Sequence, residues 1–276
     1  DVLYYKEKGE FTVKASIDCV HCYLKQAVSC MKIAGIEDEN KMHEVIYELM
    51  DYVKTFSTEA SPAENSSKIL LKTYELIGID DPYKEIKKQS NDLALKLYAG
   101  LKQKIEDSGD RLYDALKIAV AGNIIDLGIS TNFDIHEALD HSMGTGFSKD
   151  HYNLFRDKLD KVQEVLILGD NSGEIVFDKI LVEELLRLGK KVTYVVKGAP
   201  ILNDATMDDA VYVGMDKVAK VITNGSEYLG VCMNHVPEEF INTLYNANLI
   251  IAKGHANFES LEQDDMVKGK AFFLLK

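Results

Sequence analysis

Carboxylate and amide side chains follow two neighbouring apolar runs of the chain. Asp170 and Asn171 come just after the run VLILG, and Asn203 and Asp204 lie in the loop after the run VTYVV. If both runs are parallel strands of one βαβ unit, their carboxyl ends lie at the same edge of a sheet, and the two loops can meet there. Hard oxygen donors beside a helix N-terminus favour a site for a divalent metal ion and a phosphate group.

Helix capping offers a structural account of part of this pattern. Asn171 can cap the helix that begins there, and Glu174 three residues later would complete a capping box. Capping does not explain Asp170, because an unpaired carboxylate at the end of a buried strand is costly. Asp178 shares an apolar helical arc with Glu174, so both acids are expected to point inward. Asp170 is predicted to have a metal or active-site role, whereas Glu174 and Asp178 are left between a structural and a functional role.

Lysines follow two of the apolar runs. Lys197 stands where nucleotide- or S-adenosylmethionine-binding Rossmann domains usually place an acid for the ribose hydroxyls, and the first loop lacks the pattern G-x-G-x-x-G. Both observations disfavour a dinucleotide site. Lys253 and His255 follow the run NLIIA. Lys253 can hold a phosphate or be an ordinary solvated lysine, and His255 can be an acid, a ligand or a surface residue.

Cysteines gather near the N-terminus, where Cys19, Cys22 and Cys30 fall on one helical stripe. A structural zinc site is poorly supported because there is no second C-x-x-C pair. Small thiols buried in a helical core, or a thiol pair facing the site, are the two interpretations that remain. Asn123 and Asp126 lie three residues apart in an apolar stretch, so they are expected to share one helix face and to need polar partners.

The elements that position these residues change in character along the chain. Residues 16–127 show apolar spacing typical of five or six helices, and the sequence after about 145–160 contains five short β-rich runs separated by helical segments. The predicted fold is therefore α/β: an all-helical domain over residues 1–150, then a Rossmann-like α/β/α domain over 151–276 with a parallel sheet of about five strands.

Composition narrows the class of protein. The 276 residues are 46% hydrophobic, enough for a substantial core, and 32 basic residues against 45 acidic ones give a net charge of −13. That charge makes a nucleic acid an unexpected partner. No apolar run approaches the ~20 residues that cross a bilayer, no signal peptide is evident, and four cysteines are too few for a disulfide framework. We therefore expect a cytoplasmic protein without a membrane partner; the oligomeric state is not predicted.

Five separated motifs together resemble a known family. They are AGNIIDLG at 121–128, GDNSGEIVFD at 169–178, KGAPILNDAT at 197–206, KGHANFESL at 253–261 and the early DCVHC at 18–22. Their sequences and their order along the chain resemble the metal-dependent damage-control phosphatases, formerly a domain of unknown function. The resemblance is strongest to the short archaeal and bacterial branch with an N-terminal C-x-x-C. The resemblance implies a divalent metal held by Asp170, Asn171 and Asp204. The branch that acts on sugar phosphates has an Asp where this chain has His255, so a hexose phosphate is not carried over.

The expected reaction is hydrolysis of a small phosphomonoester metabolite with Mg²⁺, Mn²⁺, Co²⁺ or Ni²⁺. Backbone N–H groups of Ser172 and Gly173, together with Lys253, would receive phosphoryl oxygens. Asp204 or Glu174 would orient the attacking water.

The remaining expectations concern the pocket and the rival functions. Asn123 and Asp126, with His255, would help to form the substrate pocket. A haloacid-dehalogenase mechanism is excluded because the first loop lacks D-x-D. An S-adenosylmethionine-dependent methyltransferase and a non-catalytic binder of a metal or phosphometabolite stay open.

Overall fold

A computed structural model describes residues 1–5, 14–122, 139, 142 and 144–276 of the chain. Five neighbouring parallel strands make up most of its sheet, and each coincides with one of the five β-rich runs. These strands are β3 (Glu164–Leu168), β4 (Lys191–Val196), β5 (Lys220–Thr223), β6 (Ile250–Lys253) and β7 (Ala271–Leu275).

The sheet has seven strands in the order β2-β1-β7-β6-β3-β4-β5, so the prediction of about five was too low. The additional strands are β1 (Val2–Tyr5) and β2 (Lys149–Asp150). β1 pairs antiparallel with β7, and β2 pairs in parallel with β1. Both were missed because they have only four and two residues, and their pairing joins parts of the chain that are far apart in sequence.

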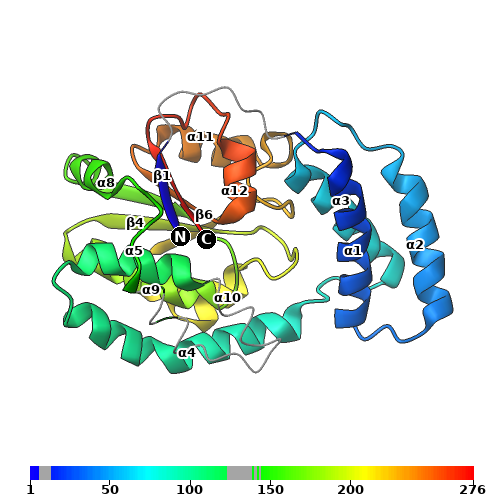
Figure 1. Cartoon of the computed structure of the whole chain (residues 1–276), viewed down its shortest axis with the longest axis horizontal. Coiled ribbons are helices and arrows are strands. Elements are labelled where there is room, and N and C mark those ends of the chain that lie inside the picture. The colour runs from blue at the N-terminus through cyan, green and yellow to red at the C-terminus, as the bar shows by residue number, and fades with distance from the viewer. Residues whose placement is uncertain (6–13, 123–138, 140–141, 143) are drawn as a thin grey trace.

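Helices cover both faces of the sheet, as expected for an α/β fold (Figure 1). α11 (Glu238–Asn246) and α12 (Gly254–Leu261) lie on one face. The other face carries α4 (Lys84–Glu106), α5 (Arg111–Ala121), α8 (Tyr152–Leu159), α9 (Glu174–Arg187) and α10 (Met207–Tyr212). Two short 3₁₀ helices complete this half of the chain: Met215–Lys217 and Met233–His235.

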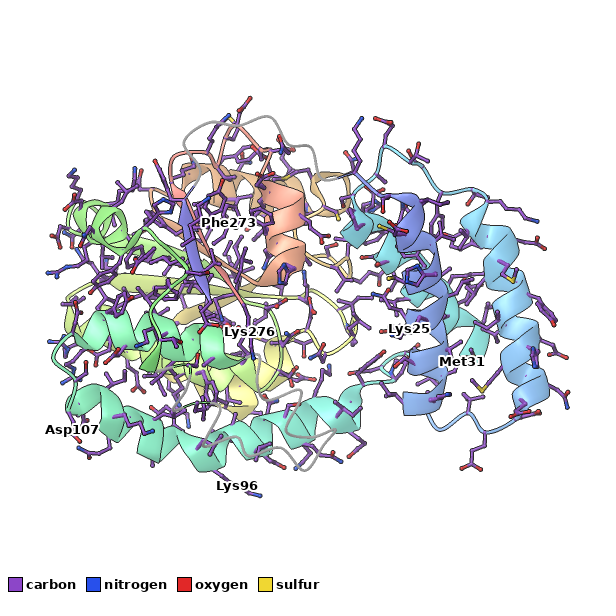
Figure 2. The ribbon with its side chains drawn as sticks, in the orientation of Figure 1. Lys25, Met31, Lys96, Asp107, Phe273 and Lys276 are labelled. Atoms are coloured by element: carbon purple, nitrogen blue, oxygen red, sulfur yellow. The ribbon has the colours of Figure 1, made fainter. Side chains whose placement is uncertain are left out.

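Strand β3 supplies side chains to both cores because successive residues of a strand point to opposite faces. Ile167 is buried in the core that α5 and α9 cover, whereas Leu168 is buried in the core beneath α11 and α12. In Figure 2, Phe273 of β7 lies inside the second core, and Lys96 and Asp107 lie on the outer side of α4 and just beyond its end. Because β3 is buried on both faces of the sheet, its sequence is a continuous apolar run.

Three further helices form a group beside the sheet with a core of their own (Figure 1). They are α1 (Ile17–Ile33), α2 (Glu39–Val53) and α3 (Pro62–Ile77). Local sequence sets the limits of α3: the Ser61 hydroxyl accepts the Glu64 N–H, proline occupies the first turn, and Gly78 ends the helix with a φ of +69°.

The helices of the predicted N-terminal domain belong to two different cores. α1, α2 and α3 share one core, while α4 and α5 pack with the sheet, chiefly against α9. The division of the chain near residue 150 stays a prediction. Among the described helices none has the length and apolar character needed to cross a membrane.

Candidate metal centre at the strand ends

The sheet changes its direction of growth at β3. β4 follows β3 in the chain and lies on one side of it, while β6, which comes later, lies on the other side. The loops that leave the carboxyl ends of β3 and β6 therefore diverge toward opposite faces, and the crevice between such loops is where ligands of α/β proteins usually bind. Asp170 follows β3 and Gly254 follows β6, so both lie at this crevice.

The two loops predicted to meet do so through their backbones. Asn171 and Asp204 form an isolated antiparallel β-bridge. Ala205 N donates to Asp170 O at 2.8 Å, and Ser172 N donates to Asn203 O at 2.8 Å. These bonds hold the loop after β3 against the loop after β4, and they bring the three residues of the expected metal set to one place.

Gly254 leaves room for the carboxylate of Asp170. A Cβ atom at position 254 would lie 1.9 Å from Asp170 Oδ2, far inside van der Waals contact, and the φ of Gly254 is +77°. The same Oδ2 accepts a hydrogen bond from Asn171 Nδ2 at 3.3 Å. The start of α12 therefore forms a wall against which Asp170 is held.

Negative charge is concentrated around Asp170. Burial raises the pKa of Asp170 well above its ordinary value of 3.8, and the nearby carboxylates of Asp204 and Glu174 raise it further, while Lys253 and Lys197 act in the opposite direction. Lys197 Nζ lies 3.5 Å from Asp204 Oδ2 and donates to the carbonyls of two residues in the loop after β5, Tyr228 and Gly230, at 2.9 and 2.7 Å. A bound cation would relieve the crowding of these carboxylates.

The donor set fits a hard divalent cation. Two carboxylates and one amide from Asp170, Asn171 and Asp204 supply oxygen ligands, and Mg²⁺ sites commonly use one or two carboxylates and keep several waters. Ser172 Oγ is buried and has no hydrogen-bond partner in the described part of the chain. No cluster of three or more His, Cys, Asp or Glu side chains within those residues could hold a metal, so an ion here depends on the amide and on waters.

Lys253 lies in a buried ion cluster beneath this site. Its Nζ donates to Glu174 Oε1, to Asp178 Oδ1 at 2.6 Å and to Ala119 O at 2.9 Å, and its side chain is fully buried. An ammonium group has three N–H bonds, and these contacts use all of them. The placement speaks against the predicted phosphate contact of Lys253. Glu174 and Asp178 point inward as expected, but toward this lysine.

The cluster continues to the strand next to β3. The Tyr194 hydroxyl on β4 donates to Asp178 Oδ2 at 2.7 Å, and a Cβ at Gly169 would lie 2.6 Å from that hydroxyl oxygen. The buried charges therefore join β4, α9 and the end of β6 directly below the loop that begins with Asp170.

The backbone N–H groups predicted to bind phosphate already have acceptors. Ser172 N donates to Asn203 O, and Gly173 N donates to Asn91 Oδ1 at 2.7 Å. The expected capping box at Asn171 and Glu174 was also wrong. α9 begins at Glu174 after Gly173, whose φ is +80°, and its N-cap makes no side-chain hydrogen bond.

The other candidates lie at the surface, in the core of the helical group or outside the described residues. His255 is exposed at the start of α12, with Nε2 3.2 Å from Lys276 O. Asn123 and Asp126 fall among the residues that the structure does not describe. Cys30 is buried in the core of the helical group as one interpretation expected, but Cys22 is exposed and Cys19 half-buried.

Cys19, Cys22 and His255 line one cavity of about 410 Å³ between α1, the start of α3 and α12.

The helical group is fixed to the same strand-end loops. Leu202 N donates to the Tyr74 hydroxyl at 2.9 Å, and Leu229 N donates to Ser67 Oγ at 2.8 Å. Ile201 is buried in the core of α1, α2 and α3. Sequence reasoning missed these contacts and Asn91, because only tertiary packing brings residues of α3 and α4 to loops more than 80 positions away.

Comparisons with known proteins agree with this geometry. Residues 15–276 match the family described as the damage-control phosphatase ARMT1-like domain. The chain is 34% identical to an uncharacterized protein of Methanocaldococcus jannaschii, covering 100% of this chain and 92% of that protein. It is 32% identical to a damage-control phosphatase of Archaeoglobus fulgidus, covering 95% and 92%.

A solved structure is also similar along nearly the whole chain. The crystal structure of a DUF89 family protein from Pyrococcus horikoshii superposes with a TM-score of 0.87 at 30% identity, covering 95% of this chain and 91% of that one.

Proposed function

This chain belongs to the ARMT1-like damage-control phosphatase family, and on that premise we propose that it hydrolyses a small phosphomonoester metabolite with a divalent metal ion held by Asp170, Asn171 and Asp204. Relatives named damage-control phosphatases make it an enzyme that hydrolyses phosphate esters in a house-cleaning role. The metal, its ligands and the kind of ester are the parts that we add.

One observation carries the proposal: two carboxylate-bearing loops are joined at the point where the sheet changes direction. The bridge between Asn171 and Asp204 and the close approach of Asp170 to Gly254 concentrate oxygen donors at the mouth of the crevice. Mutual repulsion of buried carboxylates costs free energy in the absence of a cation, and proteins accept such costs mainly at functional sites.

The chain's own residues have distinct roles in this proposal. A bound Mg²⁺, Mn²⁺, Co²⁺ or Ni²⁺ ion would polarise the phosphoryl group and neutralise charge that develops on its oxygens. Asp170 and Asp204 would hold the ion, and Asn171 would contribute an amide oxygen. Asp204 would also orient the attacking water. Glu174 acts through Lys253 rather than on the water.

Substrate selection is assigned to the rim of the crevice. His255 is exposed at the start of α12, directly after Gly254, whereas Asn123 and Asp126 lie outside the residues that the structure describes. We propose that these three residues contact the alcohol part of the ester and so select the phosphate ester that is accepted.

A methyltransferase is not favoured by the geometry. A site for S-adenosylmethionine in such a fold usually has an acid at the end of the second strand. Here that position is Lys197, whose ammonium group is bound to two backbone carbonyls and lies beside Asp204.

The first prediction tests the metal site directly. Asp170→Asn keeps the shape of the side chain and removes its charge, so we expect a loss of at least about 100-fold in kcat/KM with p-nitrophenyl phosphate in saturating Mn²⁺. EDTA should abolish turnover of the unchanged protein.

A panel of sugar, nucleotide and cofactor phosphates, each with four metals, then identifies the preferred ester.

The matched control is Asp157→Asn, which removes an exposed carboxylate from α8 and should leave turnover within about twofold. If Asp170→Asn and the control hydrolyse the ester equally well, Asp170 does not hold the metal. If EDTA leaves activity intact, the metal requirement itself is wrong.

A further inference from the structure

Asn91 on α4 links the two loops of the candidate metal centre. It is 1% exposed, its Oδ1 accepts a hydrogen bond from Gly173 N at 2.7 Å, and its Nδ2 donates to Asp209 Oδ1 at 2.8 Å. Both ends of this one amide are therefore used, and each end holds a different part of the chain.

The first bond fixes the end of the loop after β3. Gly173 lies three residues after Asp170 and precedes the first residue of α9, with a φ of +80°. A buried N–H at this turn needs an acceptor, and Asn91 supplies one from a helix 82 residues earlier in the chain.

The second bond fixes the end of the loop after β4. Asp209 Oδ2 accepts from Thr206 N at 2.9 Å and from Thr206 Oγ1 at 2.8 Å, forming the capping box at the start of α10. Thr206 comes two residues after Asp204. Asp209 thus connects Asn91 to the backbone that carries the second metal carboxylate.

Charge around this contact is balanced from the same helix. Lys87, one turn before Asn91 on α4, is 4% exposed, with Nζ 2.7 Å from Asp81 Oδ2 and 3.8 Å from Asp209 Oδ2. Lys87 therefore places a positive charge near the carboxylate group that accepts the hydrogen bond from Asn91.

We propose that Asn91 is a positioning residue that sets the spacing between Asp170 and Asp204. The inference rests on the proposed metal site and goes beyond it, because Asn91 makes none of the metal contacts. The amide of Asn91 accepts from a backbone N–H with Oδ1 and donates to a carboxylate with Nδ2 at once. Partners of this kind behind metal ligands typically change metal affinity 10- to 100-fold when they are removed.

The test measures metal affinity without turnover. Isothermal titration with Mn²⁺ gives the Kd of the unchanged chain and of two variants. Asn91→Leu removes both bonds, and Asn91→Asp places a second carboxylate against Asp209. We expect both single changes to raise the Kd on the order of 10- to 100-fold.

A double change provides the rescue. In Asn91→Asp with Asp209→Asn the carboxylate and the amide exchange places: the new carboxylate accepts from Gly173 N and from the new amide, whose oxygen accepts from Thr206. The number of buried charges is conserved. We expect this variant to recover a Kd within about threefold of the unchanged chain.

Asn65→Leu is the structural control. Asn65 on α3 is 2% exposed, and its Nδ2 donates to Ser57 O at 3.0 Å, so its loss also removes a buried amide and lowers stability. We expect no change in the Kd for Mn²⁺. Backbone amide exchange at Gly173 in the metal-free protein should be faster in Asn91→Leu and unchanged in Asn65→Leu.

The outcomes separate the inference from the function on which it rests. If the unchanged chain binds Mn²⁺ and both single variants bind it equally tightly, Asn91 does not position the ligands, although the metal site stands. A double variant as weak as Asn91→Asp also overturns the inference. If the unchanged chain does not bind Mn²⁺ at all, the proposed metal site fails, and the role of Asn91 with it.

Discussion

At Gly254 the backbone has a φ of +77°, and the space where a side chain would start is filled by the carboxylate of Asp170. Gly254→Ala would add a Cβ 1.9 Å from Asp170 Oδ2 and strain the backbone as well. The carboxylate must therefore move. We expect metal-dependent turnover to fall at least about 100-fold, since misplacing a catalytic group by ~1 Å can cost that much.

A matched glycine separates the clash from the strain. Gly35 has a φ of +74° and no atom within 4 Å of the place where a Cβ would lie. Gly35→Ala should cost about 1–2 kcal/mol of stability from the backbone alone and leave kcat/KM unchanged. Urea unfolding and steady-state kinetics on both variants decide the question. Equal activity of the two would mean that Gly254 has no bearing on Asp170.

Replacing Lys253 distinguishes its two possible roles. Loss of a buried counter-ion lowers the stability of the fold, whereas loss of a phosphate ligand raises KM. Lys253→Met leaves Glu174 and Asp178 buried without their cation, so we expect a loss of about 3–5 kcal/mol in the free energy of unfolding, measured in urea. Lys253→Met combined with Glu174→Gln and Asp178→Asn removes the unpaired charges and should recover most of that loss. A stable Lys253→Met variant with only a raised KM would instead support a phosphate contact.

Among the elements, the α1–α3 group carries ionisable groups that folding keeps neutral. Burial raises the pKa of the Cys30 thiol from 9.0 to about 12 and that of the Tyr23 hydroxyl from 10.0 to about 12. Both groups bind protons more tightly in the folded chain than in the unfolded one. Their contribution to stability is therefore complete below pH 9 and is lost as the pH rises from 9 toward 12.

Alkaline unfolding should show this dependence. We expect the free energy of unfolding to fall as the pH rises from 9 toward 12, with Cys30 alone contributing up to about 1.4 kcal/mol per pH unit. Cys30→Ala should be less stable at neutral pH, because it leaves a cavity, but it should show a shallower decline. Parallel curves for the two proteins in urea titrations at five pH values would contradict this assignment.

The elements also show what the sequence could and could not predict. The five parallel strands were identified because short apolar runs alternate with helical segments, and four of these runs contain β-branched residues and end at Gly or Asp. The meeting of Asp170 with Asp204 followed from parallel topology alone. Both predictions depended on rules that hold within one βαβ unit.

Long-range packing accounts for what the sequence did not predict. Lys253 was left between a phosphate contact and a solvated lysine, and in the folded chain two acids on α9 bind its ammonium group. The expected capping box at Asn171 failed because Gly173 provides the turn and Asn91 satisfies its N–H. No local sequence pattern predicts a hydrogen-bond partner 82 residues away, so these contacts are found only in the folded chain.

The charge of the whole molecule acts on the rate at which an anionic ester reaches the crevice. A net charge of −13 repels phosphate monoesters at long range, and the Debye length falls from about 30 Å at 0.01 M salt to about 8 Å at 0.15 M. Screening therefore removes a repulsion here, whereas in proteins that steer their ligand it removes an attraction.

We accordingly expect kcat/KM to rise about twofold when NaCl increases from 10 to 150 mM at saturating Mn²⁺, with kcat nearly constant. A doubly phosphorylated ester should gain more than a monoester of the same skeleton, because the repulsion scales with ligand charge. The kcat/KM values of both esters are measured at one pH, and the Mn²⁺ concentration is kept saturating at each NaCl concentration. A decline of kcat/KM with salt would show that the local field of the metal and of Lys197 reaches beyond the crevice and outweighs the acidic surface.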